Sequence, residues 1–421
     1  MTNLIYSHLF LFTYHRKAEQ TFQEDADISK YHQFPNGFYS RHTLADTDSL
    51  LIACSVEDKH NSPDVLPFRE LKKTLLAKRE ELAISGELLG KTWLITGYLQ
   101  LFSSHEDVAK SAYESLNFGK WRSQEAGEFM GAKLFEIWQT PHNWENLETE
   151  NNHILIIIYP DLNAMGNMAK FYEDWRQLFC YQHKIVWAYG NTRQIKPLLA
   201  ANFSPSLETL GKIQLILPEA NLLESGLDQL KQSLDENYKT LRFYAEGISL
   251  LEVQMQTIKT NNYNYLERLK TIETKANKIE PSHPNNLDML KKFSEIVQYK
   301  YQPQVEEDHA ALSPGLRLRE KEIDTIRGIV EIRQAQLDDI IEKRDRIFQE
   351  TVQEWGIGIG VAAITATSIS PFIPNITKNK LTEPFPAVEG VINFSLTFIF
   401  SIIIGIVATN KAKKLIKYRR S

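Results

Sequence analysis

The most regular pattern of apolar positions lies in residues 223–279, where apolar side chains recur at alternating steps of four and three residues. Of the seventeen positions in this register, fifteen are apolar or aromatic. Such a run predicts a left-handed coiled coil, about 85 Å long if it is straight. The two exceptions are Asn237 and Asn262. Buried amides at seam positions fix register or partner number in coiled coils. The alternative is that both asparagines lie at the edge of the seam.

Prolines divide the rest of this helical region. Pro281 and Pro284 predict the end of the coiled coil, because proline removes a backbone donor and clashes with the preceding turn. A short helix is expected over 286–301, and Pro303 and Pro314 are expected to interrupt the chain again.

Two charge-free segments follow, 355–374 and 390–409, each of twenty residues. At about 1.5 Å per residue, either segment spans a hydrocarbon core of about 30 Å. They predict a transmembrane helical hairpin. Two buried core helices are the alternative, which the lack of a polar stripe disfavours. A second heptad-spaced helix, 316–353, leads to the first span without a breaker, so it is either a mechanical coupling element or a passive stalk.

Basic residues flank the predicted hairpin on one side. Six lie among the last eleven residues, with no acidic residue between them, and three precede the first span. The positive-inside rule therefore predicts an integral membrane protein with both termini in the cytoplasm. The tail is also expected to contact anionic lipid head groups, at about 1 kcal/mol per basic residue. The residues expected to make these contacts are Lys413, Lys414, Lys417, Arg419 and Arg420.

Small and hydroxyl-bearing residues mark the first predicted span. Gly356 and Gly360 have the small-xxx-small spacing that lets helix backbones approach closely, which predicts a helix–helix contact. Thr365, Ser368 and the following Asn375 are candidates for lining a pore in an oligomer. The alternative is a polar face whose hydroxyls bond to carbonyls of their own helix. Neither span contains an ionisable residue, which disfavours a proton relay.

Residues 1–218 alternate between strand-like and helix-like patterns and predict an α/β or α+β domain. The apolar run at the start lacks a preceding basic residue and a small-residue cleavage site, so we expect a strand there and not a signal peptide. Ser104 followed by Asp107 resembles a capping box at a helix start. The expected strands are 4–13, 49–56, 91–102, 128–138, 153–159 and 184–189, and the expected helices are 66–84, 104–116 and 165–183.

Three short patterns in this domain resemble motifs that carry chemistry. Residues 90–92 (Gly-Lys-Thr) look like the end of a phosphate-binding loop, but Ser85 stands where its first glycine belongs, and a strand is expected to follow. Asp161 ends a strand where a magnesium ligand can lie, and the alternative is a turn or helix cap. Cys180 and His183 share one face of a predicted helix, but a nucleophile also needs an oxyanion hole. Cys180 is therefore expected to be a small core residue.

Composition and charge narrow the classes of protein to which this chain can belong. The chain of 421 residues is long enough for two or three domains, and 43% hydrophobic with 24% charged residues excludes a polytopic membrane protein and a disordered chain. Net charge is −5, and the basic tail leaves −11 for residues 1–410, which argues against general nucleic-acid binding. Two cysteines and eleven scattered histidines give no disulfide framework and no zinc motif. No cofactor or metal is expected.

The order of an α/β domain, long helices, a two-span hairpin and a basic tail resembles the CorA-like divalent-cation channels. That family forms pentamers, and its pore is lined by the first span, which ends in Gly-Met-Asn. Here residues 370–375 end in Asn375 without the preceding Gly-Met, so the resemblance implies an ion channel with altered selectivity. Residues 8–13 (His-Leu-Phe-Leu-Phe-Thr) together with the hairpin look like the caspase- and TPR-repeat-associated (CATRA) proteins of bacterial conflict systems. This second resemblance implies a membrane-directed effector or partner.

The sequence therefore predicts a cytosolic sensor or partner-binding domain at 1–218, coiled-coil helices at 219–354 with a break near 280–315, the hairpin at 355–409 and the tail at 410–421. The expected function is that of a non-enzymatic, membrane-anchored oligomer whose hairpin perturbs or conducts across the membrane. The alternatives are a CorA-like cation channel and a passive tether for a binding module. Expected partners are membrane lipids, further copies of the chain and a protein partner, but no nucleic acid.

Overall fold

A computed structural model describes residues 4–17, 31–58, 60, 67–82, 84–99, 104–121, 126–203 and 224–335. The chain divides into two compact units, of which the first comprises Met1–Ser206 with Asn237–Glu320 and the second Leu207–Glu236 with Lys321–Ser421. The first unit thus joins much of the helical region to the amino-terminal domain. This grouping differs from the division expected at residue 218, because the helices of 237–320 pack on the domain itself.

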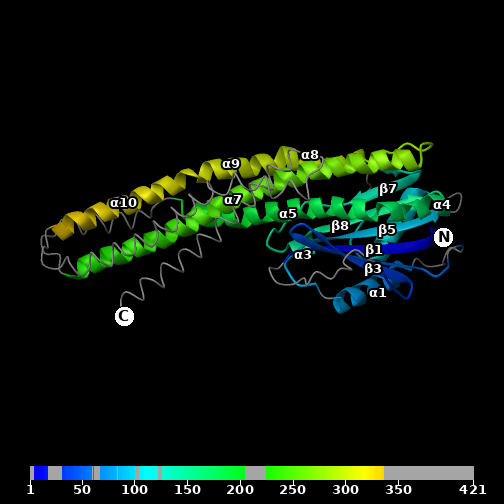
Figure 1. Cartoon of the computed structure of the whole chain (residues 1–421), viewed down its shortest axis with the longest axis horizontal. Coiled ribbons are helices and arrows are strands. Elements are labelled where there is room, and N and C mark those ends of the chain that lie inside the picture. Colours follow the sequence, from blue (N-terminus) through cyan, green and yellow to red (C-terminus); the bar gives the residue numbers. More distant parts are fainter. Residues whose placement is uncertain are drawn as a thin grey trace, which may run out of the picture. The chain divides into compact units, whose positions relative to one another are not determined.

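Within the described residues, the first unit contains one eight-stranded sheet (Figure 1). Its strands are antiparallel except for the central pair β5 and β8, which runs parallel. This sheet and the long helices beside it confirm the coarse architecture expected from the sequence. In spatial order the strands are β2 (His32–Phe34), β3 (Gly37–Leu44), β4 (Thr47–Ser55), β1 (Leu4–Arg16), β5 (Leu88–Leu99), β8 (Asn152–Tyr159), β7 (Ala132–Ile137) and β6 (Gly127–Phe129).

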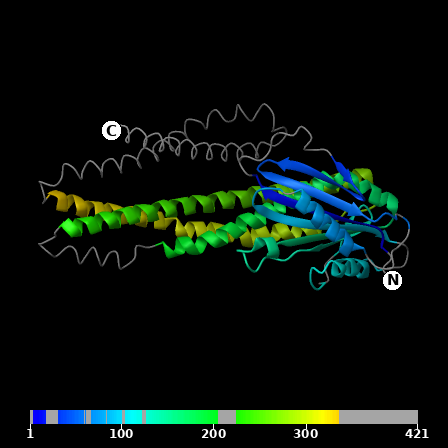
Figure 2. The same cartoon turned by 90° about the horizontal axis from the view of Figure 1, so that it is seen from below.

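The sheet has helices on both faces, as Figures 1 and 2 show. Alternate residues of β1 point to opposite faces because side chains alternate along a strand. Leu9 and Leu11 join the core beneath α1 (Phe68–Glu81) and α2 (His105–Ser115). Phe10, Phe12 and Tyr14 join the core beneath α5 (Tyr172–Ala201). β1 is therefore a central strand that is buried on both faces.

Two strand predictions need correction. Residues 184–189 are not a strand but lie in α5. Because α5 packs on the sheet and also on the later helices, it is buried on more than one side, and its apolar residues lose the helical period. Residues 128–138 form two strands, β6 and β7, since Met130 and Gly131 adopt positive φ angles of 52° and 78° and turn the chain. β2 and β3 were not expected.

The connections before α5 are short helices. α3 (Leu147–Glu150) precedes β8, and α4 (Leu162–Gly166) and the 3₁₀ helix η1 (Asn167–Phe171) follow it. Asp161 caps α4, because its carboxylate accepts a hydrogen bond from the backbone N–H of Ala164 at 2.8 Å. This is the capping role that the sequence offered as the alternative to a magnesium ligand.

The long helices follow the expected order, with one difference. α7 (Glu224–Ile279) ends just before Pro281, as predicted. The predicted interruption at Pro303 is wrong, because the chain stays helical through α8 (Asp288–Ile296), the π-helical turn η2 (Val297–Tyr301) and α9 (Gln302–Leu312). Pro303 lies in the first turn of α9, where the missing backbone N–H of proline costs least. The wider π-helical turn before it shifts the pattern of backbone hydrogen bonds, so the helix continues. α10 (Pro314–Ala335) begins at the next proline.

The heptad seam of α7 packs against helices of its own chain. Within the first unit, its apolar residues share one core with α5, α8 and α9 and a smaller one with Leu199 and Leu312. Two seam tyrosines also donate hydrogen bonds to carbonyl groups of these helices, Tyr244 to Leu312 at 2.6 Å and Tyr265 to Leu290 at 2.9 Å. The periodicity thus predicted a long helix correctly, and here the seam is filled within one chain.

The second unit is described at 224–236 and 321–335, which belong to α7 and α10. Both segments bury apolar residues at helical spacing. These residues are Leu230, Leu234, Ile323, Ile326 and Val330.

Candidate functional site

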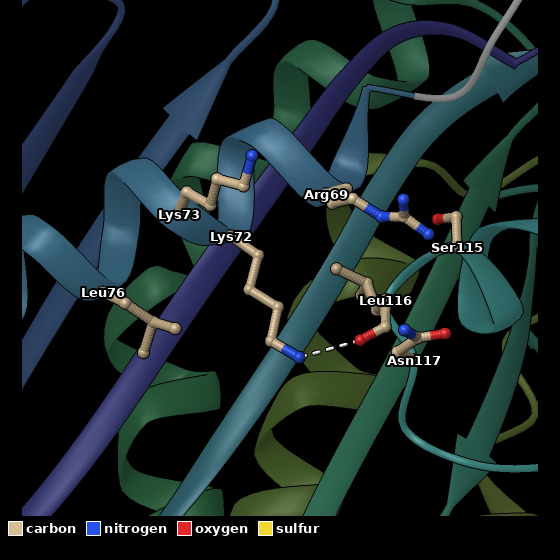
Figure 3. Close-up of a pocket in the computed structure, with 7 residues that line it drawn as sticks. All are labelled: Arg69, Lys72, Lys73, Leu76, Ser115, Leu116 and Asn117. Atoms are coloured by element: carbon tan, nitrogen blue, oxygen red, sulfur yellow. Dashed lines mark hydrogen bonds between the residues drawn. The ribbon is translucent and has the colours of Figure 1, made fainter.

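A shallow basic pocket lies between α1 and the carboxyl end of α2, with a volume of about 230 Å³ (Figure 3). Figure 3 shows the side chains of Arg69 and Lys72 reaching from α1 toward Ser115 and Leu116. No acidic residue is among those that line it. The lining residues are Arg69, Lys72, Lys73, Leu76, Ser115, Leu116 and Asn117.

The position of the pocket follows from how its two helices are held. α1 buries Phe68 and Leu75 against the sheet, which leaves Arg69 and Lys73 exposed, while Lys72 is half-buried between α1 and the sheet. α2 begins at Ser104, whose hydroxyl accepts a hydrogen bond from the N–H of Asp107 at 3.4 Å, as the sequence predicted. It ends at Ser115 with Leu116 as its cap, and the following Asn117 adopts a left-handed φ of 55° that asparagine tolerates well.

Two of the three pocket cations already have partners. Lys72 donates a hydrogen bond to the carbonyl oxygen of Leu116 at 2.8 Å, and its ammonium group lies 3.9 Å from the ring centroid of Phe118. Burial lowers the pKa of Lys72, and the nearby charge of Lys91 lowers it further. Lys73 pairs with Glu70 at 2.7 Å, but both side chains are well exposed, so the pair adds little stability.

Arg69 and Asn117 are the uncommitted donors of the pocket. In the described ranges, neither the guanidinium of Arg69 nor the side-chain amide of Asn117 makes a hydrogen bond or an ion pair. A guanidinium group offers five N–H donors in a planar fork that matches carboxylate and phosphate oxygens. The pocket therefore presents positive charge and free donors to whatever enters it.

A buried chain of polar groups lies on the opposite face of the sheet, beneath α5. The hydroxyl of Thr92 in β5 lies 2.8 Å from Nε2 of His183 in α5 and 2.9 Å from Nδ1 of His153 in β8. All three side chains are fully buried. Burial lowers the pKa of His183 well below its usual value, and the neighbouring His153 and Lys91 lower it further, so His183 is neutral at pH 7.

The ends of this chain fix the direction of every hydrogen bond in it. Trp138 donates to the side-chain oxygen of Asn151 at 3.2 Å, which turns the amide nitrogen of Asn151 toward Nδ1 of His183 at 3.1 Å. His183 therefore carries its proton on Nε2 and donates to Thr92, and Thr92 donates to Nδ1 of His153. His153 then donates from Nε2 to the carboxylate of Glu136 at 3.0 Å. The side chains between the two ends of the chain thus each accept one hydrogen bond and donate one.

Gly90 makes this arrangement possible. A Cβ atom at position 90 would lie 2.2 Å from Nδ1 of His183, closer than any carbon and nitrogen can approach. The Gly-Lys-Thr sequence at 90–92 thus lies within strand β5, and a strand was expected here. Gly90 leaves room for the ring of His183, and Thr92 supplies the hydroxyl that bonds to it. An acid, a histidine and a hydroxyl stand in the order of a catalytic triad here, but their burial leaves no path to a substrate.

α5 is also joined to the later helices through two buried carboxylates, one in α5 and one in α9. Asp174 pairs with Arg268 at 2.9 Å and Lys275 at 2.7 Å, both in α7. At the other end of α5, Lys196 lies 2.7 Å from Asp308 of α9, and Arg193 also donates to this carboxylate. Burial disfavours the ionised form of Asp308, yet its pKa is lowered because Lys196 and Arg193 both donate to it.

The remaining site predictions have different outcomes. Asn237 and Asn262 are both buried in α7, and the side-chain oxygen of Asn262 accepts no hydrogen bond within the described part of the chain. Their proposed role in register stays a prediction. Cys180 is buried in the core, as expected, and burial raises the pKa of its thiol to about 11. A thiol of that pKa is protonated at neutral pH and is a poor nucleophile.

The predicted membrane hairpin and tail lie outside the described residues. The predictions for Gly356, Gly360, Thr365, Ser368, Asn375, Lys413, Lys414, Lys417, Arg419 and Arg420 therefore stay predictions. In the ranges that the structure describes, none of the helices combines the length and the apolar character needed to cross a bilayer.

Sequence reasoning missed the basic pocket and the polar chain. The pocket had a weak local signal, since three of the five basic residues of the α1 segment line it, but its other wall comes from the end of α2, more than forty residues later. The polar chain joins residues from β5, β7, β8 and α5, so no local pattern marks it. Comparison with protein-family models, with curated proteins and with solved structures gave no match.

Proposed function

We propose that this chain is a non-enzymatic, membrane-anchored oligomer. In this proposal the sheet domain receives a ligand or a protein partner. The long helices pass the resulting change to the hairpin of 355–409, and the hairpin perturbs or conducts across the membrane. The likeness to CATRA proteins adds the proposal that it acts as an effector in a bacterial conflict system.

The observation that carries this proposal is the double attachment of α5. One side of α5 is hydrogen-bonded to the centre of the sheet through His183 and Thr92. Other residues of the same helix are ion-paired to α7 through Asp174 and to α9 through Asp308. A displacement of the sheet under α5 therefore moves the later helices, because buried ion pairs and packed cores resist sliding.

The filled seam of α7 also bears on how the chain oligomerises. Tyr244 and Tyr265 of the seam already bond to carbonyl groups of the same chain. We propose that the contact between copies is made by the hairpin, because Gly356 and Gly360 have the spacing for close helix packing.

The non-enzymatic part of the proposal is supported by the state of the reactive groups. Thr92 and its two histidines are enclosed, and Cys180 is a buried, protonated thiol. A turnover screen of the full-length protein against ester, phosphoester and peptide substrates tests this part. Activity that disappears in a Thr92→Val variant that remains folded would overturn it.

The test of the whole proposal is dye release from liposomes that carry the purified full-length protein. We expect release by the unmodified chain and loss of release when Gly356 and Gly360 are both replaced by leucine. Gly328→Leu is the matched control, because Gly328 lies in α10 with open space around its Cβ position. Protease protection of the reconstituted protein shows whether each variant inserts.

Two outcomes contradict the proposal. Release that is unchanged in the double leucine variant rejects an assembled pore that depends on these glycines. No release by a correctly inserted chain favours the passive tether. Release that is selective for divalent cations, by contrast, supports the CorA-like form of the same architecture.

A further inference from the structure

We propose that the basic pocket between α1 and α2 binds a small organic anion, with a phosphate or carboxylate head group and a short apolar body. This inference rests on the proposed function in one respect, which is that the ligand is the signal that the sheet domain receives. The binding itself is argued from the pocket and is tested without a membrane readout.

The charge of the pocket selects an anion. Arg69, Lys72 and Lys73 all come from α1, and among the described residues only Lys73 has a carboxylate partner, the exposed Glu70. The guanidinium of Arg69 has no hydrogen-bonding or ionic partner in the described ranges, so its fork is available for a bidentate contact with a head group. The amide of Asn117 offers a further donor in the same cavity.

One feature opposes an anion, and the structure offsets it. The carbonyl groups at the carboxyl end of a helix carry partial negative charge, and α2 ends at this pocket. Lys72 places its ammonium group on one of these carbonyls, that of Leu116, at 2.8 Å. The positive charge of Lys72 therefore offsets the partial negative charge at the carboxyl end of α2, and none of the described residues occupies the guanidinium of Arg69.

The size and the walls of the pocket select a small ligand that is partly apolar. Its volume of about 230 Å³ is below the roughly 300–1,000 Å³ of sites for drug-sized ligands. Leu76 and Leu116 supply apolar walls beside the cations. An inorganic ion would leave these walls exposed to water, whereas a short hydrocarbon group would cover them.

The site also has a defined connection to the rest of the domain. The ammonium group of Lys72 lies 5.8 Å from the ring of Trp93, the neighbour in β5 of Thr92. Trp93 faces α1 and α2, whereas Thr92 faces α5, because successive side chains of a strand point to opposite faces. A ligand bound beside Lys72 therefore lies next to the strand that carries the hydrogen bond to His183.

The experiment follows phenyl phosphate by ³¹P NMR as full-length protein in detergent micelles is titrated into it at constant ionic strength. Benzoate, inorganic phosphate and neutral benzyl alcohol are tested as competitors. The variant is Arg69→Gln, which removes the fork at an exposed position without breaking any contact that the structure describes. Lys270→Gln is the control, because it removes one exposed charge from α7.

We expect saturable broadening of the phosphate signal, competition by benzoate and weaker competition by inorganic phosphate. Arg69→Gln should weaken binding about tenfold or more, the loss of about 1.4 kcal/mol or more, while Lys270→Gln leaves it unchanged. The proposal is overturned by absence of saturable binding, by equal binding of Arg69→Gln, or by competition from benzyl alcohol. None of these results depends on dye release, so this proposal and the proposed function fail separately.

Discussion

The carboxylate of Asp174 accepts a hydrogen bond from Nη1 of Arg268 at 2.9 Å, although the two residues are 94 positions apart in the sequence. The bond joins the first turn of α5 to the second half of α7. Asp174 is 6% exposed, and Lys275 pairs with its other oxygen. A buried carboxylate with two cationic partners loses much stability when its charge is removed, since both partners are then left without an anion.

Replacing Asp174 with asparagine should therefore loosen α7 from α5. We expect the free energy of unfolding to fall by about 2 kcal/mol, as for hydrogen bonds to charged groups, and amide hydrogens of residues 265–279 to exchange faster. Asp288→Asn is the control, because Asp288 forms an exposed pair with Lys291, worth below about 1 kcal/mol. Equal effects of the two substitutions would show that Asp174 does not hold the helix.

Thr92→Val should destabilise the sheet domain more than the loss of one hydroxyl suggests. Valine has nearly the same shape, but it leaves Nε2–H of His183 and Nδ1 of His153 buried without partners. We expect a loss of about 3 kcal/mol in urea unfolding. Thr92→Ser keeps the hydroxyl and should cost less than half as much. A valine variant as stable as the serine variant would contradict the assigned network.

Gly90→Ala should also be destabilising, because the added Cβ would lie 2.2 Å from Nδ1 of His183. Overpacking of this kind costs about 1–3 kcal/mol. Gly166→Ala is a matched control, since nothing lies within 4 Å of its Cβ position and alanine favours helix α4 by up to about 1 kcal/mol. A thermal unfolding temperature that falls for Gly90→Ala and holds for Gly166→Ala is the expected result.

Acid should weaken the fold through His183. Its pKa in the folded protein is lowered well below 6.5 by burial and by His153 and Lys91. Below pH 6.5 the histidine of the unfolded chain is protonated, whereas His183 of the folded chain stays neutral. The free energy of unfolding therefore falls as pH falls, by up to about 1.4 kcal/mol per pH unit for this group. Burial also lowers the pKa of His15, which adds to the effect with the same sign.

Urea unfolding between pH 7.5 and 5.5 measures this dependence. His183→Gln should reduce the slope of the unfolding free energy with pH, because glutamine does not titrate. If the variant proves too unstable to compare, the imidazole signals of the unmodified protein give a second test. A resonance of folded His183 that titrates near pH 6.5 would contradict the account.

The sequence predicted a segment correctly where its side chains are either clearly buried or clearly exposed. β1, β4, β5 and β8 are apolar runs with polar flanks, and their approximate positions were correct. β2 and β3 were missed because β2 is the edge strand, β3 lies beside it and both are partly exposed, which leaves no apolar run to find. Residues 184–189 were misassigned because burial on several sides of α5 removes the polar stripe that distinguishes a helix.

The partners of each element could not be read from the sequence. The seam of α7 specifies an apolar groove, but a second copy and helices α8 and α9 fill such a groove equally well, and only tertiary structure shows the second. For the same reason Arg69 and Asn117 belong to different elements in the sequence and to one pocket in space. A residue whose role depends on distant neighbours has no local pattern.

The central claim is that, within the first unit, α5 holds the sheet and the helices of 237–320 as one body. The most direct test is the distance between spin labels at Ala77→Cys in α1 and Glu307→Cys in α9, both exposed, in the full-length protein. The native Cys54 and Cys180 are buried and should stay unlabelled. The account predicts one narrow distance distribution in liposomes, which broadens when Asp174 and Asp308 are both replaced by asparagine. A broad or multimodal distribution in the unmodified protein would contradict it.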